Sequence, residues 1–262
     1  MLNPQQIKDI DLLVKQVGEF QLENQAQVRN TEIDEKSLNQ LVSYVDVESE
    51  KMLVRSLKTI TPAAGYLTEE STDTTQNKEL YWIIDPVDGT TNYIFGLNKY
   101  AISIALYAND KPVYGCVYVA ADDELFHADP SGAYLNGTLI SVAVRSNMQD
   151  TLIATGFPYY NFAEMDEYIN VLTQLMRDTR GLRRMGSAAI DLAYTAAGRF
   201  DAFFELNLSP WDVAAGAYIV QQAGGLVTDF KGGDDYVFGT SILASSKPIY
   251  APMKKLIDQN NF

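Results

Sequence analysis

The sequence has few of the side chains that many enzymes use for covalent or redox chemistry. Its 262 residues include a single cysteine, Cys116, and a single histidine, His127. One cysteine excludes a disulfide within the chain, which suits a reducing cytoplasm, where we expect the protein to work. Both side chains fall in segments rich in β-forming residues. We therefore expect them in the strands of β-hairpins rather than in a reactive site.

Long apolar runs and basic side chains are also scarce. No apolar run approaches the roughly 20 residues that a membrane-spanning helix needs, and the start, "MLNPQQIKDIDLL", lacks the pattern of a secretory signal. The chain has 20 basic against 34 acidic residues, a net charge of −14. Binding to nucleic acid needs basic surface that neutralises phosphates, so we expect neither nucleic acid nor a membrane as a partner. The acidic surplus is a solvated surface or, in part, a cation site.

The remaining composition is that of an ordinary globular protein, 47% apolar and 21% charged. Its patterns predict helices first, then β-rich segments over 81–144 with a tight hairpin turn at Asn136-Gly137, and finally an alternation of strands and helices. The predicted helices cover 4–29, 38–60, 161–177, 187–198, 212–223 and 247–259, and the predicted strands of the last part cover 151–157, 200–206 and 225–230.

These patterns predict two halves. Residues 1–144 are expected to form an α+β subdomain with an antiparallel sheet, and residues 145–262 an α/β subdomain with a mixed sheet and interleaved helices. The boundary near 145 lacks the composition of a linker. We therefore expect the halves to share an interface, with a binding site between them.

The stretch "WIIDPVDGTTNY" (82–93) ends an apolar strand in two aspartates. Buried carboxylates are costly unless something positive lies between them. Asp85 and Asp88, with the Val87 carbonyl between them, form a set of hard oxygens that suits Mg²⁺. Gly89 allows close approach of a ligand, and a short helix opening at Thr90 would offer free amides to a phosphate. A plain Asp-Gly turn explains the same residues without a metal.

Other segments add acidic and small residues. Glu69 and Glu70 lie together in "YLTEES", and adjacent acids repel unless one faces solvent or a cation. Asp212 in "SPWDVAAGAYIVQQAGG" is predicted to be the N-cap of an alanine-rich helix. Another helix start, at 186–188, offers small residues where backbone could contact a ligand or simply pack closely.

Together these motifs make the chain resemble the inositol monophosphatase family of Mg²⁺-dependent, lithium-sensitive phosphatases. The resemblance rests on the acidic pair, D-P-V-D-G-T-T-N and W-D-V-A-A-G followed by A-G-G, in this order, and runs from about residue 36 to the end. It implies the layered α/β sandwich of the sugar phosphatases, usually a homodimer.

The resemblance also implies metal ligands. Glu69, Asp85 and the Val87 carbonyl should hold a first Mg²⁺, and Asp85 should bridge to a second that Asp88 and Asp212 complete. Two or three ions per site are implied, most of their ligands coming from the first half. Two such ions can neutralise phosphate oxygens, activate water and stabilise the leaving alkoxide.

Further roles follow by the same resemblance. Thr90 and Glu69 should orient the attacking water, and Asp46 should hold the Thr90 hydroxyl. The substrate-contact positions that the resemblance implies are Asp88, Gly89, Thr90, Ala188, Glu205 and Asp212.

The implied reaction is hydrolysis of inositol monophosphate or a related small polyol or sugar phosphate. Fructose bisphosphate and 3′-phosphonucleotides remain alternatives, although D-G-T-T-N-Y favours the inositol branch over the nucleotide branch. Gln222 stands where the family usually has glutamate, which leaves the substrate preference open. A regulatory binding role is a further alternative, with Arg180, Arg183 and Arg184 as a surface, although a solvated or dimer-facing basic cluster is the commoner explanation of such residues.

Overall fold

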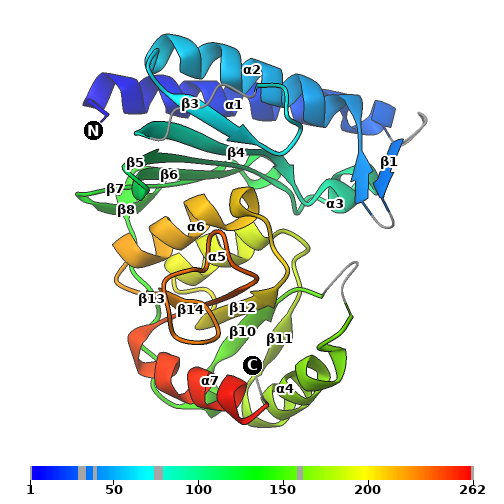
Figure 1. Cartoon of the computed structure of the whole chain (residues 1–262), viewed down its shortest axis with the longest axis vertical. Coiled ribbons are helices and arrows are strands. Elements are labelled where there is room, and N and C mark those ends of the chain that lie inside the picture. The colour runs from blue at the N-terminus through cyan, green and yellow to red at the C-terminus, as the bar shows by residue number, and fades with distance from the viewer. Residues whose placement is uncertain (1, 29–33, 38–39, 74–78, 158–161, 261–262) are drawn as a thin grey trace.

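The computed structural model describes residues 2–28, 34–37, 40–73, 79–157 and 162–260. Within these ranges the chain forms five layers in the order helices, sheet, helices, sheet, helices (Figure 1). This is the layered α/β architecture that the resemblance implies, and its largely antiparallel first sheet and mixed second sheet agree with the sequence patterns.

The first sheet has the strand order β3-β4-β5-β6-β7-β8-β9 among the described residues, and only β3 and β4 run parallel. That parallel pair brings the segment after β3 beside the end of β4, where the Glu69 N–H donates to the Ile84 carbonyl at 3.1 Å. The strands are β3 (Gly65–Thr68), β4 (Leu80–Asp88), β5 (Ala101–Ala108), β6 (Lys111–Val119), β7 (Glu124–Asp129), β8 (Gly132–Leu135) and β9 (Thr138–Leu139).

The second sheet has the order β11-β10-β12-β14-β13 among the described residues. Strand β10 runs parallel to β11 and β12, whereas β14 runs antiparallel to β12 and β13. The strands are β10 (Leu152–Thr155), β11 (Gly181–Arg183), β12 (Ala202–Leu206), β13 (Leu226–Thr228) and β14 (Ser241–Ser245); a separate short pair is formed by β1 (Asp34–Ser37) and β2 (Gln40–Val42).

Helices cover both sheets. Helices α1 (Pro4–Val28) and α2 (Tyr44–Ile60) lie on the outer face of the first sheet, and α4 (Met165–Asp178) and α7 (Lys247–Gln259) on the outer face of the second (Figure 1). Helices α5 (Ala188–Ala196) and α6 (Pro210–Gln222) fill the space between the sheets, and a single apolar core there joins residues of both halves. The shared core agrees with the expected interface, while the division at 145 stays a prediction.

Close packing of α6 on the first sheet depends on one glycine. A Cβ at Gly115 in β6 would lie 2.9 Å from the Ala215 carbonyl oxygen of α6. Since no side chain fits there, glycine lets the helix backbone approach the strand. None of the described helices is long and apolar enough to span a membrane.

Several predicted element ends need correction. Helix α2 begins at Tyr44 rather than at 38, because Gln40–Val42 pair as β2 and Ser43 is the N-cap. Helix α4 begins at Met165 rather than at 161. Position 161 lies outside the described residues, and so do position 29, the predicted end of the first helix, and positions 38–39, the predicted start of the second. The N-cap of α6 is Ser209, so the prediction that Asp212 is the N-cap is wrong.

The other elements agree with the sequence patterns. The hairpin turn at Asn136-Gly137 joins β8 and β9, and both residues have positive φ, 48° and 76°, as a two-residue hairpin turn of this type requires. Helix α3 (Thr90–Ile94) opens directly after Gly89, whose φ of 98° makes the turn. The sequence patterns gave no prediction for β1, β3, β11 and β14, which are all short strands.

Candidate active site

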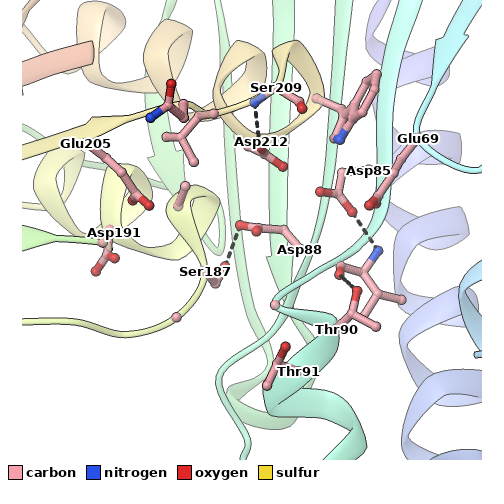
Figure 2. Close-up of a pocket in the computed structure, with 18 of the residues that line it drawn as sticks. Glu69, Asp85, Asp88, Thr90, Thr91, Ser187, Asp191, Glu205, Ser209 and Asp212 are labelled. Atoms are coloured by element: carbon pink, nitrogen blue, oxygen red, sulfur yellow. Dashed lines mark hydrogen bonds between the residues drawn. The ribbon is translucent and has the colours of Figure 1, made fainter. Parts of the chain in front are cut away.

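A pocket of about 310 Å³ opens where β4 ends, between the starts of α5 and α6 and the end of β12. It is lined by both halves of the chain. Every site residue predicted from the sequence except Asp46 lines it. Figure 2 shows the carboxylates of Glu69, Asp85, Asp88 and Asp212 pointing into one space, with Glu205 on the far side of Asp88.

The closest group of acids is Asp85, Asp88 and Asp212. One oxygen from each lies within 4.8 Å of the others. Two come from the end of β4, and Asp212 comes from the first turn of α6, where it accepts a hydrogen bond from the Ser209 N–H at 2.7 Å. Three carboxylate oxygens this close form a donor set that fits a hard divalent cation such as Mg²⁺.

The turn after β4 is fixed by hydrogen bonds within the motif. The Val87 N–H donates to Asp85 Oδ1 at 2.9 Å, and the Thr90 hydroxyl lies 3.1 Å from the Val87 carbonyl oxygen. The same hydroxyl lies 3.0 Å from Asp46 Oδ1 on α2. Asp46 is fully buried behind the pocket, where it also accepts from the Ser43 N–H at 3.0 Å. Thus Asp46 contacts Thr90, as predicted, without reaching the pocket itself.

Asp88 is held from the other side of the pocket. Its Oδ2 accepts from the Ser187 hydroxyl at 2.6 Å (Figure 2) and from the Ala189 N–H at 2.6 Å. These donors belong to the first turn of α5, so the helix start that carries the predicted contact Ala188 is tied directly to the acidic motif.

Burial and mutual repulsion disfavour the charged forms of these acids. Burial is the main cause that raises the pKa of Asp85 well above its ordinary value, and the nearby carboxylates Glu69, Asp88 and Asp212 raise it further. Burial, with repulsion by Asp212, raises the pKa of Asp88 to about 7. Burial also raises the pKa of Asp212 to about 6, although the Ser209 N–H favours its charged form. Near neutral pH the cluster therefore favours a bound cation.

In metal-free buffer, we expect the free energy of unfolding to fall as the pH rises from about 4 to about 7. A folded-state pKa above the unfolded value means that the folded protein binds more protons in this window, so raising the pH favours unfolding. Urea unfolding in EDTA at pH 5 and pH 8 measures the difference. Asp88→Asn should reduce it, since its pKa of about 7 makes Asp88 a main contributor. Stability that rises with pH through this window would contradict the assignment.

Three residues near the pocket were not predicted from the sequence. Gln21 of α1 is fully buried and donates from Nε2 to the Pro86 carbonyl at 2.8 Å. Glu50 of α2 accepts hydrogen bonds from the segment after Glu69. Asp191 of α5 lines the pocket close to Glu205 (Figure 2). Burial, then repulsion between them, raises the pKa of Asp191 well above its usual range.

Glu205 occupies space that only glycine leaves open. A Cβ at Gly156, just past β10, would lie 1.9 Å from Glu205 Oε1. Burial, followed by repulsion from Asp212 and Asp88, raises the pKa of Glu205 well above its ordinary value, while Arg184 opposes the shift. Beyond the acidic cluster, the pocket thus offers carboxyl groups that can accept hydrogen bonds from hydroxyls.

Comparison with known proteins fits this geometry. The model of the family described as "Inositol monophosphatase family" matches residues 4–259. The chain belongs to the inositol monophosphatase family. Family membership thus confirms the resemblance drawn from the motifs around Asp85 and Asp212.

Family relatives resemble the chain over most of its length. It is 40% identical to "Nus factor SuhB" of Vibrio cholerae over 86% of this chain and 84% of that protein. It is 36% identical to "Inositol-1-monophosphatase" of Mesorhizobium japonicum over 88% of each chain. The crystal structure of the extragenic suppressor protein suhB from Bartonella henselae, 35% identical, superposes with a TM-score of 0.92 over 97% of this chain and 98% of that one.

Proposed function

We propose that the protein is a Mg²⁺-dependent phosphomonoesterase that hydrolyses inositol monophosphate or a related small polyol or sugar phosphate with an activated water. The observation that carries this proposal is the convergence of Asp85, Asp88 and Asp212, with the Thr90–Asp46 hydrogen bond beside them, in one pocket. Family membership supports the reaction class.

We propose that Glu69, Asp85, the Val87 carbonyl, Asp88 and Asp212 would hold two or three Mg²⁺ ions, a proposal supported by the cluster of Asp85, Asp88 and Asp212. When bound, Mg²⁺ supplies positive charge for the phosphate oxygens and lowers the pKa of water. The described lining of the pocket contains no cysteine, histidine or lysine. Cys116 and His127 pair with each other in β6 and β7, as predicted for hairpin strands, so neither competes with water as a nucleophile.

The chain's own residues would place the water and the phosphate. Glu69 and the Thr90 hydroxyl orient the water as proton acceptors, and Asp46 fixes the position of that hydroxyl through their 3.0 Å contact. The backbone amides of Gly89 and Thr90 would bind the phosphate next to the cation site that the acidic cluster forms. Positioning of this kind converts a bimolecular attack into one within a complex.

Hydroxyl groups of the substrate would bind on the far side of the pocket. Glu205 and Asp191 offer carboxyl oxygens there, and Ala188 leaves room for the substrate's carbon skeleton. This arrangement favours a polyol over a phosphate ester without hydroxyls, and the name of the Mesorhizobium japonicum relative points the same way. Fructose 1,6-bisphosphate and 3′-phosphonucleotides are the alternative substrates.

Phosphate release from a panel of inositol, fructose and nucleotide phosphates tests the proposal. We expect release to require Mg²⁺ absolutely, to be fastest with an inositol or other polyol monophosphate, and to be inhibited by lithium. Substantial release after exhaustive treatment with EDTA would refute the mechanism, because no other nucleophile is proposed.

A regulatory binding role is a second candidate, favoured by relatives named "Nus factor SuhB". The three arginines proposed for such a surface are all exposed, although Arg180 also pairs with Asp150 at 2.9 Å and Arg184 also lines the pocket. Binding of transcription complexes by an inactive Asp212→Asn variant would separate this role from hydrolysis. We also propose a homodimer as the working assembly.

A further inference from the structure

The carboxylate of Glu50 is buried behind the pocket and bonded to a loop. Its side chain is fully shielded from solvent. Oε2 accepts from the Glu70 N–H at 2.7 Å, and Oε1 accepts from the Thr72 N–H at 2.8 Å and the Thr72 hydroxyl at 2.6 Å. Hydrogen bonds to a charged acceptor are stronger than those between neutral groups, so this is a firm attachment.

The loop that Glu50 holds starts with the pocket residue Glu69. Glu69 follows the last residue of β3, and its own N–H is paired with the Ile84 carbonyl. The next residues turn sharply, since Ser71 has a φ of 55°. A little further along, Asp73 pairs with Lys58 of α2 at 2.5 Å. The bonds to Glu50 fix the part of the loop between these two attachments.

Glu50 lies one helical turn after Asp46 on the same face of α2. Residues four apart on a helix are neighbours on its surface. Asp46 contacts the hydroxyl of Thr90, and Glu50 contacts the backbone next to Glu69. One face of α2 therefore attaches two separate segments that meet at the pocket.

We propose that Glu50 is a positioning residue for Glu69, and through it for a divalent cation bound in the pocket. The role rests on the proposed function, since it assumes that Glu69 is a cation ligand. Groups that orient the ligands of a metal change its affinity by about 10–100-fold when they are replaced.

Glu50→Gln tests this role with little change in shape. An amide has one acceptor oxygen, and its NH₂ group cannot accept from an N–H. In either orientation of the amide, the Glu70 N–H or the Thr72 donors lose their acceptor. We expect the dissociation constant for Mn²⁺, measured by EPR without substrate, to rise by about 10–100-fold. The Mg²⁺ concentration for half-maximal activity should rise in parallel, with kcat largely recovered at saturating Mg²⁺.

Glu48→Gln is the matched control. Glu48 lies on the same helix but is half-exposed and pairs with Lys51 at 2.7 Å. The Glu48→Gln variant should bind Mn²⁺ with the same dissociation constant as the wild type. A general loss of stability would lower the unfolding midpoint of Glu50→Gln but leave the Mn²⁺ constant of the folded fraction unchanged, and that result overturns the proposal.

Thr72→Val covers the case in which Glu50→Gln does not fold. It removes only the hydroxyl donor to Oε1 and should weaken Mn²⁺ binding less, in the same direction; wild-type affinity in this variant would then overturn the proposal. Measurements on the wild type distinguish failure of the proposed function from failure of the role of Glu50. If it binds Mn²⁺ but hydrolyses no phosphate ester, the proposed function fails while the comparison of Mn²⁺ constants still decides the role of Glu50.

Discussion

Replacing Asp212 by asparagine is expected to lower phosphate release by orders of magnitude while leaving the metal-free protein at least as stable as the wild type. Asparagine can still accept from the Ser209 N–H, which Asp212 does at 2.7 Å. It also removes a buried charge from the acidic cluster, and the pKa of about 6 shows that this charge is disfavoured there. Loss of the same charge should weaken Mg²⁺ binding, since the cation depends on it.

Two measurements separate the roles of Asp212. The unfolding midpoint in EDTA reports its place in the first turn of α6, and phosphate release over a range of Mg²⁺ concentrations reports its place in the cation site. Activity should recover only partly at high Mg²⁺. Near-normal turnover at low Mg²⁺ would mean that Asp212 serves the helix alone.

Asp201→Asn is a control for which the opposite pattern is expected, a change in stability without a change in the cation site. Asp201 is fully buried away from the described lining of the pocket, where it pairs with Arg145 at 2.8 Å and accepts from the Leu152 N–H at 2.9 Å. Asparagine offers one acceptor oxygen where Asp201 offers two, so the bond from the half-exposed Arg145 or the bond from the Leu152 N–H is lost, which should lower the unfolding midpoint. The dependence on Mg²⁺ should not change.

Local sequence patterns were sufficient to predict the structure of the part of the site that lies on β4 and directly after it. An apolar strand, a proline, two aspartates and a glycine within 82–93 specify a strand, a turn and a short helix by their own backbone preferences, and the structure has all three. The helix start at Ser187 was predicted for the same reason. Features determined by neighbouring residues can be predicted from a single sequence.

Helix starts were predicted less well where two capping residues were available. Asp212 and Ser209 both favour an N-cap, and Pro210 decides between them because proline fits the first helical position. At α2, the apolar pattern continued backward through residues that instead pair as β2. Strand pairing depends on a partner strand, so periodicity alone gave the wrong start.

Contacts between distant residues were beyond prediction. Gln21 is 65 residues from Pro86 and Glu50 is 20 residues from Glu70 in the sequence. Each lies at helical spacing among residues of an ordinary helix, and only the packing of α1 and α2 on the sheet brings it to a backbone group near the pocket. The acids of the site are also distant from one another in the sequence, but they could be assigned to one site because their motifs resemble those of a single family.

Glu69→Gln is expected to reduce turnover by orders of magnitude, and Glu70→Gln to leave it close to the wild type. Glu69 lines the pocket and lies close enough to Asp85 for its carboxylate to raise that pKa. Glu70 lies outside the described pocket lining, and its contact with Glu50 uses the backbone N–H, which the substitution keeps. The two variants remove the same charge from adjacent positions, so they are matched in chemistry and differ in placement.

Both variants should be assayed for phosphate release and for Mn²⁺ affinity. Glu69→Gln should lose both, because an amide nitrogen cannot serve as a ligand and the remaining oxygen carries no charge. High Mg²⁺ should recover part of its activity if the lost ligand acts mainly through binding. Equal losses in the two variants would show that the acidic pair has been assigned in the wrong register, since the segment after β3 would then direct Glu70 toward the cation.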